Sequence, residues 1–288
     1  MPIDVEAALA AEFAPASAEW TQNQVILYAL GLGVGVGADP NDPAVLRYTY
    51  ETGLKVIPTF GVIPTFSSLG NLGSTPGLDI NVMMILHGEQ YLEILCDELP
   101  ANAKTQTTSR IRAIYDKGKG ALIIIEATTS SDSGKPLFRN EFGIFVRGEG
   151  GFGGESGPPA GNEPPDREPD LSFETPTLPN QAHIYRLSGD FNPLHIDPEF
   201  ATMAGFERPI LHGLCTFGNI GRAVIEGMCD GDPTRFRSIK VRFAAPVIPG
   251  ETIVTDMWKE SDTDIIVRGR VKERDVEVVK NARVTIRA

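Results

Sequence analysis

One short stretch of the chain places an acid, a carboxamide and an imidazole beside residues that bend the backbone. Asp190, Asn192 and His195 stand in the run D-F-N-P-L-H. Asp190 and His195 are five residues apart, which does not put them on one face of a helix, so they converge only if the run forms a loop. Pro193 fixes its own φ and biases the preceding residue toward an extended conformation, which supplies the bend. A carboxylate and an imidazole on a constrained loop suit acid–base chemistry on a carbonyl compound.

The residues after this loop predict two helices that would hold it in place. Asp197 is a suitable N-cap, Pro198 fits the first helical position, and Gly205 is a helix stop. His212 and Gly213 then open a longer apolar segment. The sequence therefore predicts a loop, a short helix, a second loop and a longer helix, with the acid and imidazole facing a helix N-terminus.

The stretch 185–218 closely resembles the hydratase 2 motif of the MaoC-like hot-dog superfamily, which includes bacterial R-specific enoyl-CoA hydratases. The likeness continues in L-Y-A-L-G at 27–31, in H-G-E-Q-Y-L-E at 87–93, and in residues 58–62, 148–154 and 242–250. It covers most of the chain. The resemblance implies an α+β double hot-dog fold, in which two antiparallel sheets each wrap a central helix. It also implies reversible hydration of trans-2-enoyl-CoA to (3R)-3-hydroxyacyl-CoA in fatty acid metabolism.

The resemblance implies a role for each residue of the motif. In the family, Asp190 and His195 hold one water that adds across the double bond, and Gly213 offers its backbone N–H to the thioester oxygen. Asn192 would orient the water or the substrate. From the residues alone, other interpretations stay open: Asp190 caps a turn, His195 is a buried histidine, Asn192 forms an Asx-turn, and Gly213 relieves crowding. Which of Asp190 and His195 is acid and which is base also stays open.

Further residues correspond to positions that contact the substrate in the family, or are implicated in its function: His87, Gly88, Lys117, Phe243 and Glu51. Lys117 lies in the turn D-K-G-K-G, where the resemblance implies contact with CoA and the alternative is a solvated hairpin lysine. Phe243 is also explained as an inward strand residue. Glu51 stands in Y-T-Y-E, where the flanking sequence is less similar. His212 is not catalytic in the family, so we interpret it as structural.

The sequence predicts no metal and no cofactor beyond the CoA of the substrate. Asp, Asn and His all ligate metals, but D-x-N-x-x-H-x-D lacks the Gly and Glu of a calcium loop, and Asp197 caps its own helix. The glycine run 148–154 lacks the flanking strand and helix of a dinucleotide fingerprint. The cysteines show no metal-type spacing, and their odd number suggests free thiols in a reducing compartment: Cys96, Cys215 and Cys229.

Composition excludes several classes of protein. The 288 residues are 41% hydrophobic and 22% charged, which is typical of a globular protein with one large or two ordinary domains. The net charge of −12 disfavours a nucleic-acid partner, although an anionic coenzyme needs only a local basic patch. No apolar run is long enough to span a membrane. The last residues, T-I-R-A, form no peroxisomal tripeptide, so we expect a cytoplasmic protein if it is free-standing and a peroxisomal one if it is a domain of a larger enzyme.

Hydrophobic patterning divides the chain into two similar halves. Residues 1–147 would accommodate the acyl chain and CoA, residues 148–170 form a Gly/Pro-rich linker, and residues 171–288 carry the catalytic motif. T-F-G occurs at 59–61 and 216–218, and G-E at 88–89 and 250–251, in the same order, which supports a duplication. The catalytic motif itself has no counterpart in the first half.

The predicted elements follow from periodicity and turn residues. Helices are expected at 25–32, after a capping box, and at 214–228. Short extended pieces are expected at 47–50 and 55–57, and a hairpin at 105–115 and 121–129. Further strands are expected at 83–86, 90–96, 137–146, 239–243, 253–258, 265–271, 276–279 and 283–287. Glycines at 218 and 221 would let the second helix approach its sheet closely.

Two alternative functions and one assembly state complete the expectations. The first alternative is a 3-hydroxyacyl thioester dehydratase acting on CoA or carrier-protein substrates with the same residues. The second is a non-catalytic acyl-CoA binding module, against which the intact Asp190/His195 pair argues. Exposed sheet edges favour a homodimer.

Overall fold

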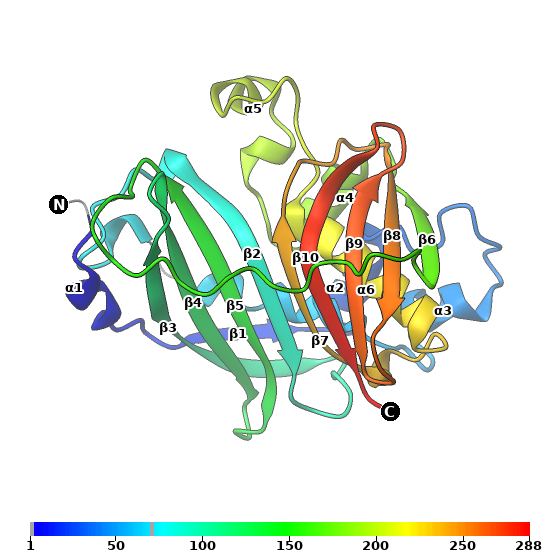
Figure 1. The fold of residues 1–288 in the computed structure, drawn as a ribbon. Coiled ribbons are helices and arrows are strands. Elements are labelled where there is room, and N and C mark those ends of the chain that lie inside the picture. Colours follow the sequence, from blue (N-terminus) through cyan, green and yellow to red (C-terminus); the bar gives the residue numbers. More distant parts are fainter. Residues whose placement is uncertain (1–2, 70–71) are drawn as a thin grey trace.

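The strands of this computed structural model, which describes residues 3–69 and 72–288, form one antiparallel sheet (Figure 1). The strands of the first half are β1 (Ala16–Trp20), β2 (Ile85–Ile94), β3 (Ala103–Asp116), β4 (Gly120–Ser131) and β5 (Pro136–Arg147). Those of the second half are β6 (Leu171–Pro176), β7 (Phe236–Phe243), β8 (Thr252–Lys259), β9 (Asp264–Val271) and β10 (Val276–Ile286). The α-helices are α1 (Val5–Leu9), α2 (Gln22–Gly31), α3 (Pro43–Thr49), α4 (Gln181–Tyr185), α5 (Pro198–Met203) and α6 (Gly213–Met228).

The order of the strands shows how the two halves join. It runs β1-β3-β4-β5-β2-β7-β10-β9-β8-β6, so each half contributes five neighbouring strands. β2 and β7 pair across the middle, from Glu89 opposite Arg242 to Glu93 opposite Ser238. The predicted double hot-dog fold is confirmed, but the two sheets are joined edge to edge into one, because β2 and β7 satisfy each other's backbone groups.

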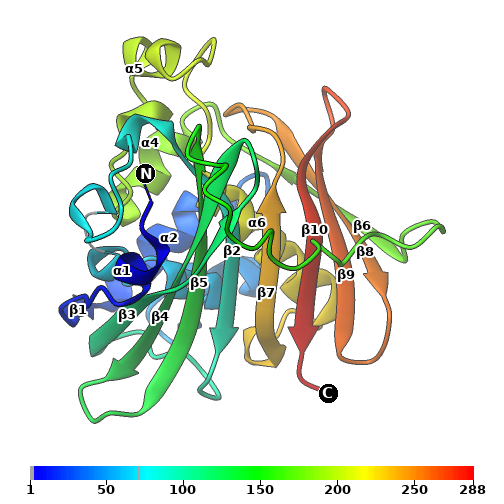
Figure 2. The same ribbon diagram turned by 60° about the vertical axis from the view of Figure 1, so that its left-hand side comes forward.

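Helix α6 lies behind the sheet and packs against the first half of the chain (Figure 2). A Cβ at Gly218 would lie 2.6 Å from Leu32 Cδ2, and one at Gly221 would lie 2.6 Å from Thr59 Cγ2. The missing side chains of the two glycines therefore leave space for Leu32 and Thr59 of the first half. The sequence analysis instead predicted that they let the helix approach its own sheet. Residues of both halves share the core around α6, and a second buried cluster lies within the first half.

The first half has no helix comparable to α6 among its described residues. The corresponding T-F-G lies in a 3₁₀ turn, η1 (Pro58–Val62), all five residues of which are buried. Pro58 and Pro64 lack backbone N–H groups and restrict the preceding residues, which prevents a long helix here. Phe60 in this turn packs edge-on against Trp20 and Tyr28, each with a ring-centroid distance of 5.5 Å.

The other predicted elements are largely found, with differences at strand edges and loops. The predicted hairpin is β3 and β4, and the strands at 137–146, 239–243, 253–258 and 265–271 correspond to β5, β7, β8 and β9. Residues 47–49 were expected to be extended but belong to α3, which Asp42 caps through a bond from the Ala44 N–H and in which Pro43 occupies the first turn. β2 continues through His87 with a bulge, and β10 is one irregular strand where two were expected.

Residues 148–170, which we call the strap, form no helix or strand and cross the outer face of the sheet from the end of β5 to the start of β6 (Figures 1 and 2). The carboxylate of Asp116 accepts hydrogen bonds from the N–H groups of Gly151 and Gly153, both at 2.9 Å. At the other end, the Asn281 amide donates to the Gly161 carbonyl at 2.7 Å. None of the helices within residues 3–69 and 72–288 is both long and apolar enough to cross a bilayer.

Candidate active site

The loop between α4 and α5, residues 186–197, brings the acid and the imidazole of the motif together. We call it the catalytic loop, after the role that the sequence predicts for it. The Asp190 carboxylate accepts a hydrogen bond from the Asn192 N–H at 3.2 Å. Asn192 then caps a 3₁₀ turn, η6 (Pro193–His195), by accepting from the Leu194 N–H at 3.1 Å. The side-chain oxygen of Asn192 thus stabilises a turn, which agrees with the Asx-turn interpretation of this residue. Pro193 is the first residue of the 3₁₀ turn and His195 is the last.

His195 is held in one tautomer. Its Nδ1 lies 2.9 Å from the carbonyl oxygen of Ile210, and because a carbonyl only accepts, Nδ1 carries the proton. In the neutral ring Nε2 is then an unprotonated acceptor. Burial lowers the pKa of His195, while the charge of Asp190 and the bond to Ile210 oppose that shift. His195 is therefore neutral at neutral pH, and its Nε2 can accept a proton.

His212, which the sequence left as structural, contacts both members of the pair. Its ring stacks on that of His195 with centroids 3.8 Å apart and planes at 30°. Its Nε2 donates to the backbone carbonyl of Asp190 at 3.1 Å. Burial, with a smaller contribution from His195, lowers the pKa of His212 to about 3, so the ring is neutral. The adjacency of His212 to Gly213 was the one sequence signal for this position.

Three of these groups also come close enough to consider a metal site. Asp190, His195 and His212 each bring one possible ligand atom to within 4.8 Å of the others. The lone pair of an imidazole nitrogen lies in the plane of its ring, and the two rings are stacked with nearly parallel planes. Stacked rings are not the usual arrangement of two imidazoles on one ion. The His212 Nε2 is also already used by the Asp190 carbonyl, which leaves only its Nδ1 as a possible ligand atom.

The N-terminus of α6 forms the second part of the site. Gly213 is the first residue of this 16-residue helix, so its N–H precedes the intrahelical hydrogen bonds. A Cβ on Gly213 would lie 3.4 Å from the ring of Phe243. The Phe243 ring in turn meets His87 edge-on, with centroids 5.3 Å apart. The predicted residues Gly213, Phe243 and His87 are thus brought together, and Gly88 lies in the β2 bulge beside them.

His87 links this wall to the interior of the first half. Its Nε2 donates to the Glu89 carbonyl at 3.1 Å, and burial lowers its pKa to about 4, so it is neutral. Its ring lies 5.7 Å from that of Phe142, which is 6.3 Å from that of Phe66. An apolar row therefore leads from the site into the first half.

The last two predicted residues lie apart from the catalytic loop. Lys117 is in the turn between β3 and β4, where its ammonium donates to the Ser156 carbonyl of the strap. Glu51 is exposed and follows α3, whose Arg47 contacts the Gly231 carbonyl beyond the C-terminal end of α6. Because the catalytic loop is at the opposite end of α6, the structure does not bring Glu51 to the site.

Comparisons with known proteins show which family the chain resembles over its whole length. The chain matches "MFE-2 hydratase 2 N-terminal domain" over residues 19–148 and "MaoC like domain" over residues 161–282. It is 44% identical to a probable enoyl-CoA hydratase 2 of Dictyostelium discoideum, over 99% of this chain and 97% of that protein. It is 46% identical to the peroxisomal multifunctional enzyme type 2 of Mus musculus, over 94% of this chain and 37% of that one. A solved MaoC-like dehydratase from Phytophthora capsici covers 99% of both chains with a TM-score of 0.86 and 36% identity.

Proposed function

The chain belongs to the hydratase 2 family of MaoC-like proteins, and we propose that its Asp190 and His195 activate the water that adds to the enoyl thioester. Relatives aligned over nearly the whole chain are named enoyl-CoA hydratases, and this protein is an enoyl-CoA hydratase of fatty acid metabolism. The observation that carries the catalytic assignment is the fixed tautomer of His195, which leaves Nε2 unprotonated on a ring that has a nitrogen within 4.8 Å of an Asp190 carboxylate oxygen.

The chemistry follows from the protonation of the two groups. The water between Asp190 and His195 gives a proton to His195 Nε2, and its oxygen forms a bond to C3 of the enoyl group. The C2–C3 π electrons move toward the thioester oxygen, producing an enolate. The imidazolium, stabilised by the Asp190 charge, then returns the proton to C2, so one water is added in total. Asn192 would contact this water or the substrate through its exposed amide nitrogen.

The N-terminus of α6 stabilises the enolate. The Gly213 N–H has no intrahelical acceptor, and the helix dipole places about half a positive charge at this end. One such donor typically contributes about 3 kcal/mol to the stabilisation of an oxyanion. We further propose that the acyl chain follows the apolar row past His87 toward Phe142 and Phe66, with Gly88 and Phe243 beside the thioester.

Because hydroxyl and proton come from one water, both add to the same face of the double bond, and we propose that this face is the one that gives the (3R) alcohol, as the family resemblance implies. The test uses trans-2-decenoyl-CoA, with loss of the enoyl absorbance as the signal and chiral analysis of the product. Asp190→Asn and His195→Gln should each abolish turnover while their circular dichroism spectra match the parent. Full activity in either folded variant would contradict the assignment, and an (S) product would contradict the proposed face.

The remaining expectations concern assembly, cofactors and compartment. We propose a homodimer, since β1 and β6 leave the two outer edges of the sheet without a neighbouring strand among the described residues. Light scattering coupled to size exclusion distinguishes it from a monomer. We also propose that no metal or other cofactor takes part, and that the compartment is the cytoplasm for a free-standing chain or the peroxisome for a domain of a larger enzyme. A fluorescent fusion of the full natural chain tests the compartment.

A further inference from the structure

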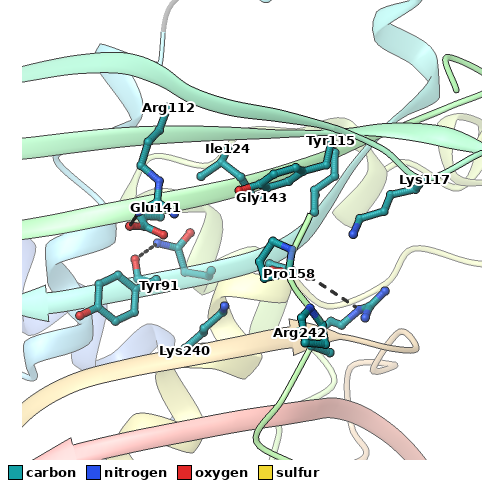
Figure 3. A pocket seen from close by; sticks show the side chains of 15 residues that line it. Tyr91, Arg112, Tyr115, Lys117, Ile124, Glu141, Gly143, Pro158, Lys240 and Arg242 are labelled. Carbon is teal, nitrogen blue, oxygen red and sulfur yellow. Dashed lines mark hydrogen bonds and ion pairs between the residues drawn. The ribbon is translucent and has the colours of Figure 1, made fainter. Parts of the chain in front are cut away.

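A cleft of about 220 Å³ lies on the outer face of the sheet, between the strap and the seam of β2 and β7 (Figure 3). Side chains alternate along β7, so Lys240 and Arg242 line this cleft while Val241 between them joins the core around α6. The cleft and the catalytic loop therefore lie on opposite faces of the same strands. Pro158 of the strap stands over the cleft opposite these two cations.

The charges of the cleft are not balanced. It contains four cationic side chains and two carboxylates, a net charge of +2 in a chain whose net charge is −12. The six are Arg112, Lys117, Lys240, Arg242, Glu89 and Glu141. Arg112 pairs with Glu141 at 2.9 Å, and Arg242 lies 3.9 Å from Glu89. Lys240 has no ion-pair partner among the described residues, so an anion entering the cleft would meet uncompensated charge.

The strap is fixed on both sides of this cleft by hydrogen bonds and packing. Beyond its bonds to Asp116, the strap accepts a hydrogen bond from the Asp116 N–H at the Glu155 carbonyl, at 2.8 Å. At Gly157 it lies against the ring of Tyr115, where an added Cβ would be 2.6 Å from the ring carbon Cγ. Asn281 holds it again at Gly161. The segment 158–160 is thus anchored at Gly157 and Gly161, and it forms one wall of the cleft.

The cleft is also adjacent to the catalytic site. Arg242 precedes Phe243, whose ring contacts the Gly213 wall on the other face of β7. Glu89 likewise follows the bulge that contains Gly88. β7 ends at Phe243, so a flexible arm that starts at a thioester beside Gly213 would have to pass around this end of the strand to enter the outer-face cleft.

We propose that this outer-face cleft binds the phosphates of the CoA nucleotide, with Lys240 and Arg242 as the phosphate-binding cations. The proposal rests on the proposed function and adds these two residues to the CoA contact expected at Lys117. Charge-assisted bonds to phosphate are among the stronger polar contacts, and cations in a partly enclosed cleft are screened less than on an open surface.

The experiment compares two substrates, trans-2-decenoyl-CoA and the N-acetylcysteamine thioester of the same acid, which lacks the nucleotide. Lys240→Glu and Arg242→Gln should raise KM for the CoA ester about tenfold or more, in line with the loss of a bond to a charged group. They should leave kcat with the CoA ester, and both constants with the truncated ester, close to the parent values. Lys104→Glu, an exposed cation on β3 outside the cleft, makes the same change of net charge as Lys240→Glu and should leave all constants unchanged.

A binding measurement keeps this proposal separate from the catalytic one. Calorimetry with 3′,5′-ADP should show binding to the parent that weakens in both cleft variants, and inorganic phosphate should compete only weakly. Equal rises of KM for the two substrates, or 3′,5′-ADP binding that the variants do not change, would overturn the cleft assignment. Turnover of the truncated ester by the parent would leave the proposed function standing in that event. If the parent turned over neither ester, the proposed function would fail and the 3′,5′-ADP titration would still decide the cleft.

Discussion

Replacing His212 by Gln should make the fold less sensitive to acid. The neutral imidazole of His212 is buried, and burial lowers its pKa from 6.5 to about 3. In the unfolded chain the same imidazole is protonated once the pH falls below about 6.5. Between pH 6.5 and pH 3 the unfolded state binds a proton at this imidazole and the folded state does not. The free energy of unfolding therefore falls as the pH is lowered through this range.

The size of the effect follows from linkage. Each pKa unit corresponds to about 1.4 kcal/mol. Between pH 7 and pH 5 the protonated fraction of the unfolded His212 rises from about one quarter to nearly one, while the folded His212 stays almost unprotonated. Integration gives a loss of about 2 kcal/mol for this residue. That is a substantial share of a typical stability of about 5–15 kcal/mol. His87, whose pKa burial lowers to about 4, should contribute a similar loss over the same interval.

Urea unfolding at pH 7 and at pH 5 measures the difference. In His212→Gln the loss between the two pH values should shrink by about 2 kcal/mol, because the group that titrates is gone. Gln keeps an amide donor that can reach the Asp190 carbonyl, so the variant should still fold. His183→Gln removes an exposed imidazole on α4 and should leave the pH dependence as in the parent. An unchanged pH dependence in His212→Gln would refute the argument that burial keeps this ring neutral.

Three other predictions follow from features of the fold and site. Gly221→Ala would place a methyl 2.6 Å from Thr59 Cγ2 and should cost about 1–3 kcal/mol in urea unfolding, whereas an unchanged midpoint would mean that α6 shifts freely. Asp256→Asn weakens the bonds that its buried carboxylate accepts from Arg268 and Arg270 and should cost about 1–3 kcal/mol by the same measurement, with no loss refuting a stabilising role. Turnover should survive treatment with EDTA, and a loss that an added divalent cation restores would show that a metal takes part.

The parts of the site that could be predicted from the sequence are those with local signals. Asp197 accepts bonds from the N–H groups of Glu199 and Phe200 as an N-cap, Pro198 begins α5, and α6 begins at Gly213, as expected. These features depend only on the residues next to them. The roles of Asp190 and His195 came from the resemblance, and the structure adds the tautomer of His195, which no sequence pattern encodes.

The features that could not be predicted depend on distant parts of the chain. β1 was missed because A-S-A-E-W has a weak strand pattern, and what makes it a strand is pairing with β3, about ninety residues away. The stack of His212 on His195 likewise requires the fold to be complete. α3 was misread for a different reason: its aromatic and β-branched residues favour extended structure, but the cap at Asp42 and Pro43 decided the local conformation.

The seam between β2 and β7 has a consequence for how the protein is made. Glu89 and Arg242 are opposite each other in this seam, and they are 153 positions apart in the chain (242 − 89). During synthesis at about 5–20 residues per second, β2 must wait on the order of ten seconds or more before its partner strand leaves the ribosome. Until then the first half displays an unpaired strand edge, the kind of surface on which chains associate wrongly. We therefore expect that newly made first halves need protection by chaperones, and that this seam is among the last contacts to form.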